Sequence, residues 1–213
     1  MYEQDKREII QAALEIKNYG LIALSGGNVS VRKGNGDVIV TPSGTSYETM
    51  REDDLIVLNA KGERVEGELR ESVDTIALQY IFNQMPEVNA IIHTHQPYAT
   101  AVGLIGDVFP AALTTLANVT LGAINVAPYC SAASIDMGVQ AVKYLGGKRA
   151  VILKHHGVIT VGGNLKEALY AAIYMEEAAK AYLAAKAAGP VAIMTDEQTA
   201  DAVEIHRSYG QQH

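Results

Sequence analysis

Three histidines stand at the ends of predicted buried strands, where their side chains can meet. His93 and His95 are one residue apart and follow the apolar run 90–92, and His156 comes shortly after the apolar run 150–153. Side chains at positions i and i+2 of a strand point to the same side, about 6.5–7 Å apart at Cα. A third imidazole from another strand end would complete three corners of a metal polyhedron. The spacing therefore predicts a metal site in preference to three unrelated histidines.

A carboxylate, Asp74, opens a predicted helix nineteen residues before His93. Negative charge is also favoured at a helix N-terminus by the macrodipole. Taken alone, Asp74 is explained equally well as a helix cap or as part of a site. Combined with three imidazoles, it would form a catalytic centre with one or two positions open for substrate oxygens. A structural zinc site would more often use cysteines, and the chain has only Cys130.

Two turns rich in glycine and hydroxyl groups could hold an anion. The segment 25–30 reads Ser-Gly-Gly-Asn-Val-Ser, and the segment 41–44 reads Thr-Pro-Ser-Gly. Amide N–H groups in such turns can cradle a phosphate, to which Ser72 could add a hydroxyl. Ordinary turn chemistry explains each of these pieces as well. Neither the dinucleotide fingerprint nor the P-loop pattern is present.

Hydrophobic periodicity and turn residues predict helices that alternate with strands. Asn164 and Glu167 form a capping-box pattern ahead of a long alanine-rich helix. The expected helices cover residues 5–19, 74–84, 97–104, 134–145, 164–188 and 195–206, the last capped by Thr195 or Asp196. The expected strands cover residues 28–32, 38–41, 55–58, 63–66, 89–93, 123–126, 150–153 and 158–161.

This alternation runs through residues 1–213 without a linker, a repeat or a break in composition. We therefore expect an α/β fold of one domain, with a mixed central β-sheet covered by helices on both faces. The hairpins predicted near the N-terminus exclude an all-parallel sheet.

Bulk composition limits the partners of the chain. Asp and Glu number 24 against 17 Lys and Arg, for a net charge of −7, and this acidity argues against nucleic acid as a partner. No apolar run approaches the roughly 20 residues of a membrane span, and the charged N-terminus has no signal-peptide core. With a single cysteine and no possible intrachain disulfide, a cytoplasmic location is expected.

The motifs occur together as a group: G-N-x-S at 27–30, T-P-x-G at 41–44, H-x-H at 93–95 and H-G at 156–157. This group, with comparable spacing over residues 20–209, resembles the class II aldolase/adducin family, and is most similar to its ketose-1-phosphate aldolases. The resemblance implies a single class II aldolase-like domain and homotetramers with active sites at subunit interfaces.

Roles for individual residues follow from the same resemblance. His93, His95 and His156 match the ligands of one divalent ion per subunit, with Zn²⁺ expected and Mn²⁺, Co²⁺ or Ni²⁺ also suited to such ligands. Asp74 matches the catalytic acid/base, and Tyr209 matches a C-terminal tyrosine that reaches the site of a neighbouring subunit. The phosphate-binding positions of the family correspond to Gly27, Asn28, Ser43, Gly44 and Ser72.

The implied activity is a lyase reaction of carbohydrate metabolism. A ketose 1-phosphate would be cleaved to dihydroxyacetone phosphate and a short aldehyde, with the ion stabilising the enediolate. Asp74, where the family usually has glutamate, makes a sugar-phosphate 4-epimerase the nearest alternative, and a decarboxylase or dehydratase could use the same ion. A non-catalytic adducin-like module is disfavoured because all three histidines are kept.

Two departures affect the expected phosphate site. Val73 replaces a phosphate-binding serine, and Glu71 adds a negative charge that would repel a phosphate unless a cation intervenes. Arg70 and Lys154 are the cations considered for that role.

Overall fold

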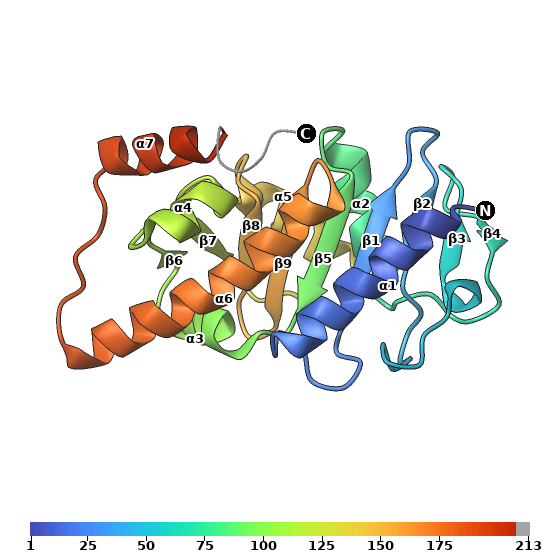
Figure 1. Cartoon of the computed structure of the whole chain (residues 1–213), viewed down its shortest axis with the longest axis horizontal. Coiled ribbons are helices and arrows are strands. Elements are labelled where there is room, and N and C mark those ends of the chain that lie inside the picture. The colour runs from blue at the N-terminus through green and yellow to red at the C-terminus, as the bar shows by residue number, and fades with distance from the viewer. Residues whose placement is uncertain (208–213) are drawn as a thin grey trace.

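The computed structural model describes residues 1–207 (Figure 1). In this part of the chain seven α-helices alternate with nine strands. The helices are α1 (Glu3–Asn18), α2 (Thr75–Gln84), α3 (Pro97–Ile105), α4 (Thr114–Thr120), α5 (Ile135–Leu145), α6 (Leu165–Ala188) and α7 (Asp196–Arg207). The strands are β1 (Gly27–Arg32), β2 (Val38–Val40), β3 (Ile56–Leu58), β4 (Arg64–Glu66), β5 (Ala90–Thr94), β6 (Val108–Phe109), β7 (Ile124–Ala127), β8 (Ala150–Leu153) and β9 (Gly157–Gly162).

All described strands join one mixed sheet in the order β4-β3-β2-β1-β5-β9-β8-β7-β6. β7 and β8 run parallel, and every other neighbouring pair is antiparallel. The predicted mixed sheet is confirmed, as is the α/β class. Because β5 lies between β1 and β9, its C-terminal end lies beside the first residues of both neighbours.

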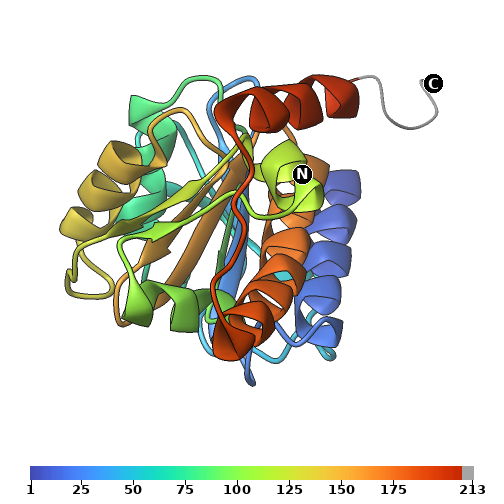
Figure 2. The ribbon, with the colours of Figure 1, turned by 90° about the vertical axis from the view of Figure 1, so that its left-hand side faces the viewer.

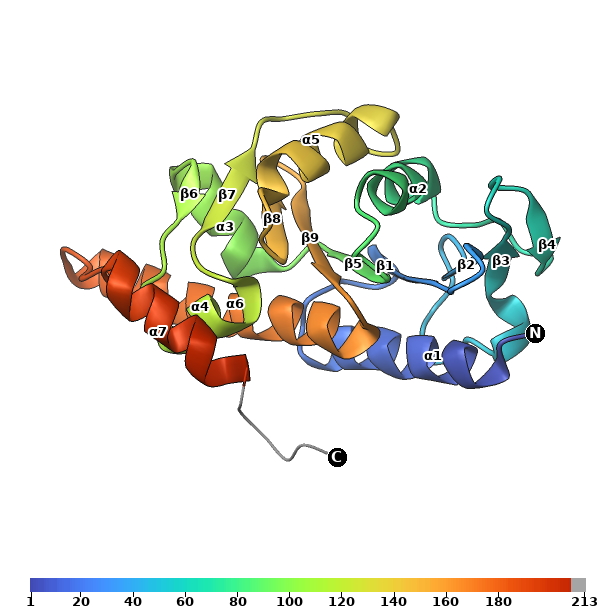
Figure 3. The same cartoon turned by 90° about the horizontal axis from the view of Figure 1, so that it is seen from above.

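Helices cover both faces of the sheet (Figures 2 and 3). α2 and α5 pack side by side on one face, while α1 and α6 lie on the other. Successive residues of the buried strand β5 pack alternately against the helices on the two faces of the sheet. Ile91 packs in the cluster under α2 and α5, whereas Ala90 and Ile92 pack in the cluster under α1 and α6. By the same period of two, His93 belongs to the face that α2 covers.

The predicted elements are confirmed, with shifts of one or two residues at their ends. Three short elements were not predicted: β6, α4 and a single 3₁₀ turn at Glu52–Asp54. β6 is too short to show alternation, and the polar, β-branched composition of α4 gives no helical pattern. Among the described residues, no helix combines the length and the apolar character needed to cross a bilayer.

Both predicted N-caps of the C-terminal helices are present. Asn164 Oδ1 accepts the backbone N–H of Glu167 at 3.0 Å, while the Glu167 carboxylate reaches one residue further back, to the Gly163 N–H at 2.9 Å. Thr195 caps α7, because its Oγ1 accepts the N–H of Gln198 at 3.2 Å and its own N–H donates to the Gln198 side chain at 2.9 Å. These contacts satisfy backbone donors that the first turn of a helix leaves open.

A buried carboxylate of α6 fixes the helix that follows the H-x-H motif. Glu176 is 1% exposed, and its two oxygens accept the N–H groups of Tyr98 and Ala99 at 3.0 and 2.9 Å. Gln96, also buried, donates to the Ala172 carbonyl of α6 at 3.3 Å. Burial raises the pKa of Glu176, while the two backbone N–H groups act in the opposite direction. The start of α3, directly after His95, is thereby tied to α6.

Replacement of Glu176 by Gln should lower the free energy of unfolding by about 1–3 kcal/mol, the cost of leaving a buried donor unpaired. An amide offers one acceptor oxygen, so its NH₂ group would face the second backbone N–H. Chemical denaturation measures the change. Glu177→Gln is the matched control, because Glu177 is exposed and, among the described residues, forms an ion pair only with Lys180. It should change stability by less than about 0.5 kcal/mol. Equal stability of Glu176→Gln and the control would contradict this role.

Candidate metal centre

The strand register brings the three histidines together. His93 lies in β5 opposite Ile159 of β9, and Thr94 lies opposite Val158. His95 follows β5 directly, and His156 is the last residue of the turn that enters β9. This turn is closed by a hydrogen bond from the His156 N–H to the Leu153 carbonyl at 3.0 Å. Two imidazoles from one strand end and one from the adjacent turn therefore meet at the same edge of the sheet.

The distances between the rings suit a shared cation. His93 Nε2 and His95 Nε2 are 3.1 Å apart, and one nitrogen from each of the three rings lies within 4.8 Å of the others. Bonds of about 2.0–2.1 Å to a tetrahedral zinc would place two ligand nitrogens about 3.3 Å apart. The rings meet edge to face or tilted, with centroids 4.8–5.2 Å apart. The predicted cluster of His93, His95 and His156 is confirmed as a group that could hold a metal ion.

Hydrogen bonding leaves ligand nitrogens available. His93 Nδ1 lies 2.9 Å from the Val158 carbonyl, which can only accept, so Nδ1 carries the proton and Nε2 keeps its lone pair. His156 Nδ1 is buried and has no hydrogen-bond partner among the described residues. A buried polar atom without a partner is costly unless a ligand satisfies it. The imidazole nitrogens therefore fit a divalent metal ion. The Val158 carbonyl orients one of these ligands, His93, through the ring nitrogen that faces away from the ion.

Burial keeps the imidazoles neutral, as metal ligands must be. Burial, with smaller contributions from the neighbouring His156 and His95, lowers the pKa of His93 to about 3. Burial also lowers the pKa of His95 and of His156, and the Asp74 charge opposes this in both. The pKa directions therefore agree with rings that offer lone pairs, and a bound cation would disfavour protonation further.

Two glycines make room for the rings and the strand that carries them. A Cβ on Gly157 would lie 2.3 Å from the Thr94 carbonyl oxygen and 3.0 Å from the His95 ring. A Cβ on Gly27 would lie 2.7 Å from the His93 carbonyl oxygen. Only glycine allows this approach of backbones. Gly27 thus has a packing role in addition to the phosphate-binding role predicted for it. The same close packing explains why a glycine, Gly157, follows His156 in the H-G pair.

Asp74 lies beside the histidines and does not cap α2. It is the residue before the helix, yet its side chain accepts no hydrogen bond from the first helical turn. Asp74 Oδ2 is instead 3.9 Å from His93 Nε2 and 3.0 Å from Asn28 Nδ2, and Oδ1 accepts the Ala133 N–H at 3.3 Å. The carboxylate is buried, at 6% exposed. Of the two interpretations that the sequence left open, the structure favours a residue of the site.

The predicted phosphate positions line one flank of this site, but several of their donors are already used. Ser43 N–H donates to the Arg70 carbonyl at 2.8 Å, Ser72 N–H to Thr41 at 3.3 Å, and Gly27 N–H to Ser25 at 3.1 Å. Gly44 has a positive φ of 69°. Among the predicted phosphate positions, the Gly44 N–H and the hydroxyls of Ser43 and Ser72 donate to no partner within the described residues.

The charge of Glu71 is neutralised by a residue that was not expected. Glu71 forms an ion pair with Arg64 of β4, whereas Lys154 pairs with Asp107 at 2.8 Å. A hydrogen bond from its own backbone N–H, followed by the contact with Arg64, lowers the pKa of Glu71, and Arg70 adds only a smaller charge effect. Arg64 therefore supplies the main counter-charge of Glu71, and of the two cations considered from the sequence Arg70 contributes a smaller part, while Lys154 pairs with Asp107. Arg64 was missed because it is seven residues away and reaches Glu71 only through the hairpin.

The remaining residues near the motifs are placed as follows. His155 is exposed, has a left-handed φ of 63° and lies beside the Tyr129 ring, in agreement with its exclusion from the ligand set. Cys130 is half-buried against the core under α2 and α5, and burial raises the pKa of its thiol. Tyr209 lies outside the described residues. The backbone groups of Ala133 and Val158 complete the site, and no side-chain pattern could have predicted them.

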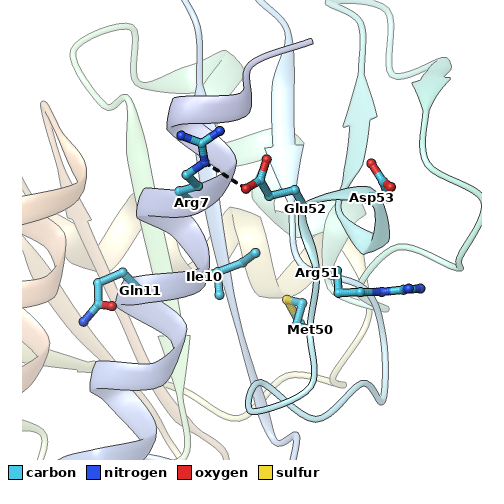
Figure 4. A pocket seen from close by; sticks show the side chains of 7 residues that line it. All are labelled: Arg7, Ile10, Gln11, Met50, Arg51, Glu52 and Asp53. Carbon is cyan, nitrogen blue, oxygen red and sulfur yellow. Dashed lines mark hydrogen bonds and ion pairs between the residues drawn. The ribbon is translucent and has the colours of Figure 1, made fainter.

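The more prominent surface hollows lie elsewhere. A groove of about 500 Å³ runs between α1 and residues 50–53, as Figure 4 shows. An ion pair between Arg7 Nε and Glu52 Oε1, 2.8 Å long, spans it. None of the described residues that line this groove is a histidine, and Met50 at its base packs in the core under α1, on the opposite face of the sheet from Ile91. The chemistry is therefore assigned to the histidine cluster.

Replacement of His95 by Ala should weaken zinc binding by more than about 100-fold, because loss of outer partners of a ligand alone costs 10–100-fold. Elemental analysis after zinc loading and dialysis, with a calorimetric titration, measures the loss. The matched control is His155→Asn, which alters the neighbouring exposed histidine with a residue that tolerates its left-handed φ. Zinc retained at one ion per chain in His95→Ala would rule out this centre.

Comparison with known proteins identifies the family of the chain. A sequence profile described as "Class II Aldolase and Adducin N-terminal domain" matches residues 7–183. The L-fuculose phosphate aldolase of Escherichia coli (strain K12) is 32% identical over 205 residues, which cover 96% of this chain and 94% of that enzyme.

Solved structures agree with this assignment. A structure of L-fuculose 1-phosphate aldolase has a TM-score of 0.90 at 30% identity and covers 95% of each chain. The crystal structure of YgbL, a putative aldolase/epimerase/decarboxylase from Escherichia coli, shares the fold, with a TM-score of 0.81 at 21% identity over 94% of this chain and 98% of that one. The chain therefore belongs to the class II aldolase/adducin family, and within that family to the aldolase enzymes.

Proposed function

We propose that this enzyme cleaves a ketose 1-phosphate to dihydroxyacetone phosphate and a short aldehyde by a metal-dependent retro-aldol reaction. The observation that carries the proposal is the buried Asp74 carboxylate, whose Oδ2 is 3.9 Å from His93 Nε2 in a cluster of three neutral imidazoles. The similarity to L-fuculose phosphate aldolase over nearly the whole chain supports the substrate class. Retro-aldol chemistry needs a Lewis acid and a nearby proton carrier, and this arrangement supplies both.

A divalent ion held by His93, His95 and His156 would act as a Lewis acid on the substrate carbonyl oxygen and the negative charge that develops there. We propose Zn²⁺ as that ion, because three imidazoles with open positions are typical of catalytic zinc. Mn²⁺, Co²⁺ and Ni²⁺ accept the same donors. The buried His156 Nδ1 without a partner supports a bound ion at this place.

Asp74 is proposed as the proton carrier. Cleavage of the bond between C3 and C4 of the ketose leaves a pair of electrons on C3 and turns the C4 hydroxyl into the aldehyde. A carboxyl group beside the ion can give a proton to C3 during cleavage and remove it during condensation. Asp74 is held for this task by two N–H donors on opposite oxygens, from Asn28 and Ala133.

The phosphate end of the substrate is proposed to bind the turn at 41–44 and the start of α2. The hydroxyls of Ser43 and Ser72 and the Gly44 N–H offer donors, and the pairing of Glu71 with Arg64 reduces the repulsion that Glu71 would cause. Gly27 and Asn28 flank the same area on β1. Neutral donors of this kind bind phosphate without a basic side chain.

The aldehyde end of the site and the assembly are proposed from the family resemblance. In a homotetramer, Tyr209 of the subunit next to the one that holds the ion would take the proton of the C4 hydroxyl during cleavage and return it to the aldehyde oxygen during condensation. The exposed apolar side chains of Leu24, Val73 and Tyr129 lie on loops around the histidines and could serve such an interface. Light scattering on the purified protein gives the oligomeric state, and a Tyr209→Phe variant tests the tyrosine.

Zinc-loaded protein should release dihydroxyacetone phosphate from ketose 1-phosphates, and the activity should vanish after chelation and return with Zn²⁺. A substrate panel with products identified by NMR is the measurement. Formation of an epimer, of carbon dioxide or of a dehydrated sugar instead of dihydroxyacetone phosphate would replace the aldolase assignment by that of an epimerase, decarboxylase or dehydratase. Full activity in metal-free protein would contradict the proposal altogether.

Asp74→Asn should lower kcat by about 10²–10⁴-fold, the contribution of a placed general acid or base, while the bound zinc stays within about 20% of wild type. An amide keeps the shape of the side chain but can neither give up nor take a proton at neutral pH. Steady-state kinetics and elemental analysis on the same sample separate the two effects. Asp136→Asn alters an exposed carboxylate at the start of α5 and serves as the control with wild-type kcat. A fully active Asp74→Asn enzyme would exclude Asp74 as the proton carrier.

A further inference from the structure

We infer that Gln96 is a positioning residue for the metal centre, because its buried side chain fixes the direction in which the backbone presents His95 to an ion. Gln96 follows His95 directly in the chain and is 0% exposed. Its side chain reaches α6, on the face of the sheet opposite the one that α2 covers. The inference rests on the metal ion of the proposed function but not on the reaction, so its test needs no substrate.

The His95 ring has no anchor of its own in the described part of the chain. His93 is 1% exposed, and its Nδ1 donates to the Val158 carbonyl at 2.9 Å. The His95 side chain is the most exposed of the three, and its ring forms a hydrogen bond only with His93 Nε2, at 3.1 Å. An ion bound between the rings would occupy the nitrogens of that contact. The aim of the His95 ring therefore depends on the backbone that carries it.

The Gln96 amide ties the chain on both sides of His95 to α6. Gln96 Nε2 donates to the Ala172 carbonyl of α6 at 3.3 Å, and Gln96 Oε1 accepts the Thr94 hydroxyl at 2.7 Å. A carbonyl oxygen only accepts, so the amide nitrogen must face Ala172 and the amide oxygen must face Thr94. Thr94 is also buried, at 1% exposed. The residues before and after His95 are thus joined to each other and to a helix backbone.

The backbone beyond His95 is restricted at each step. Gln96 precedes Pro97, which favours extended backbone, and it has φ −60° and ψ 127°. The Gln96 carbonyl accepts the Thr100 N–H at 3.1 Å, and the buried Glu176 carboxylate accepts the two N–H groups that follow Pro97. Glu176 therefore fixes α3, and Gln96 fixes the one residue between α3 and His95. A ligand on such a support is held in place before an ion arrives.

Replacement of Gln96 by Met keeps the length of the side chain and removes both of its hydrogen bonds. The Kd for Zn²⁺ should rise about 10–100-fold, the cost of losing an outer partner of a metal ligand. Calorimetric titration of metal-free protein with Zn²⁺ measures Kd, and the visible absorption of Co²⁺-loaded protein, which reports ligand geometry, should shift. Thr94→Val removes the Thr94 hydroxyl at nearly constant volume. It gives the same test, with a Kd at least threefold higher, if Gln96→Met does not fold.

Thr160→Val is the matched control. Thr160 is 0% exposed in β9, and its hydroxyl donates to the Ala168 carbonyl of α6 at 2.9 Å, one helical turn before the carbonyl that Gln96 uses. The control removes a buried hydrogen bond to the same helix, but neither neighbour of Thr160 in the chain is a histidine. Chemical denaturation of the metal-free proteins should show a loss of stability in both variants, whereas the Kd of Thr160→Val for Zn²⁺ should stay within about threefold of wild type.

Failure of the inference can be told apart from failure of the proposed function. A wild-type Kd and an unchanged Co²⁺ spectrum in Gln96→Met would overturn the inference and leave the metal centre intact. A Thr160→Val effect on Kd as large as that of Gln96→Met would also overturn it, because the loss would then follow from reduced stability. A wild-type protein that binds Zn²⁺ but cleaves no ketose 1-phosphate would remove the proposed reaction alone, and one that binds no Zn²⁺ would remove both.

Discussion

The site depends on the hydrogen-bonded register of three neighbouring strands, β1, β5 and β9. Because both neighbours of β5 are antiparallel to it, its C-terminal end meets the first residues of β1 and of β9. His93 and His95 come from the end of β5, His156 from the turn into β9, and Asn28 from the start of β1. A shift of one residue in either pairing would turn these side chains to the opposite face. Close backbone packing at Gly27 and Gly157 allows this register.

Electrostatics makes the cluster costly without a cation. Burial lowers the pKa of all three imidazoles, and Asp74 adds a buried carboxylate at their edge. Hydrogen bonds from Asn28 and Ala133 satisfy part of that carboxylate. Three neutral lone pairs, one carboxylate and an unpartnered His156 nitrogen still form an environment that a divalent cation stabilises more than water does. The burial and the negative charge that make an empty site costly therefore also favour a divalent cation.

Residues outside the histidine cluster support it through hydrogen bonds on both faces of the sheet. On the face of α6, Glu176 and Gln96 fix the start of α3, and with it the chain that leaves His95. On the face of α2, the Val158 carbonyl orients His93 and the Ala133 N–H holds Asp74. Arg64 neutralises Glu71 near the expected anion positions. The histidines, Asp74 and the positions proposed for an anion are therefore supported by different elements.

Local sequence patterns determined much of this protein. The spacing of His93 and His95, the caps at Asn164 and Thr195, and the alternation of helices and strands follow from side-chain direction and backbone hydrogen bonding over a few residues. These patterns predicted the fold class and the meeting of the three histidine side chains at one site. They could not predict β6 and α4, whose residues carry no periodic signal, nor decide whether Asp74 caps a helix. The tertiary structure alone decided that Asp74 turns toward His93, that Arg64 pairs with Glu71, and that Asn28 is occupied by Asp74 and Ser72. Those contacts join strand residues to the loop that precedes α2, and their distances depend on register and packing rather than on neighbours in the chain.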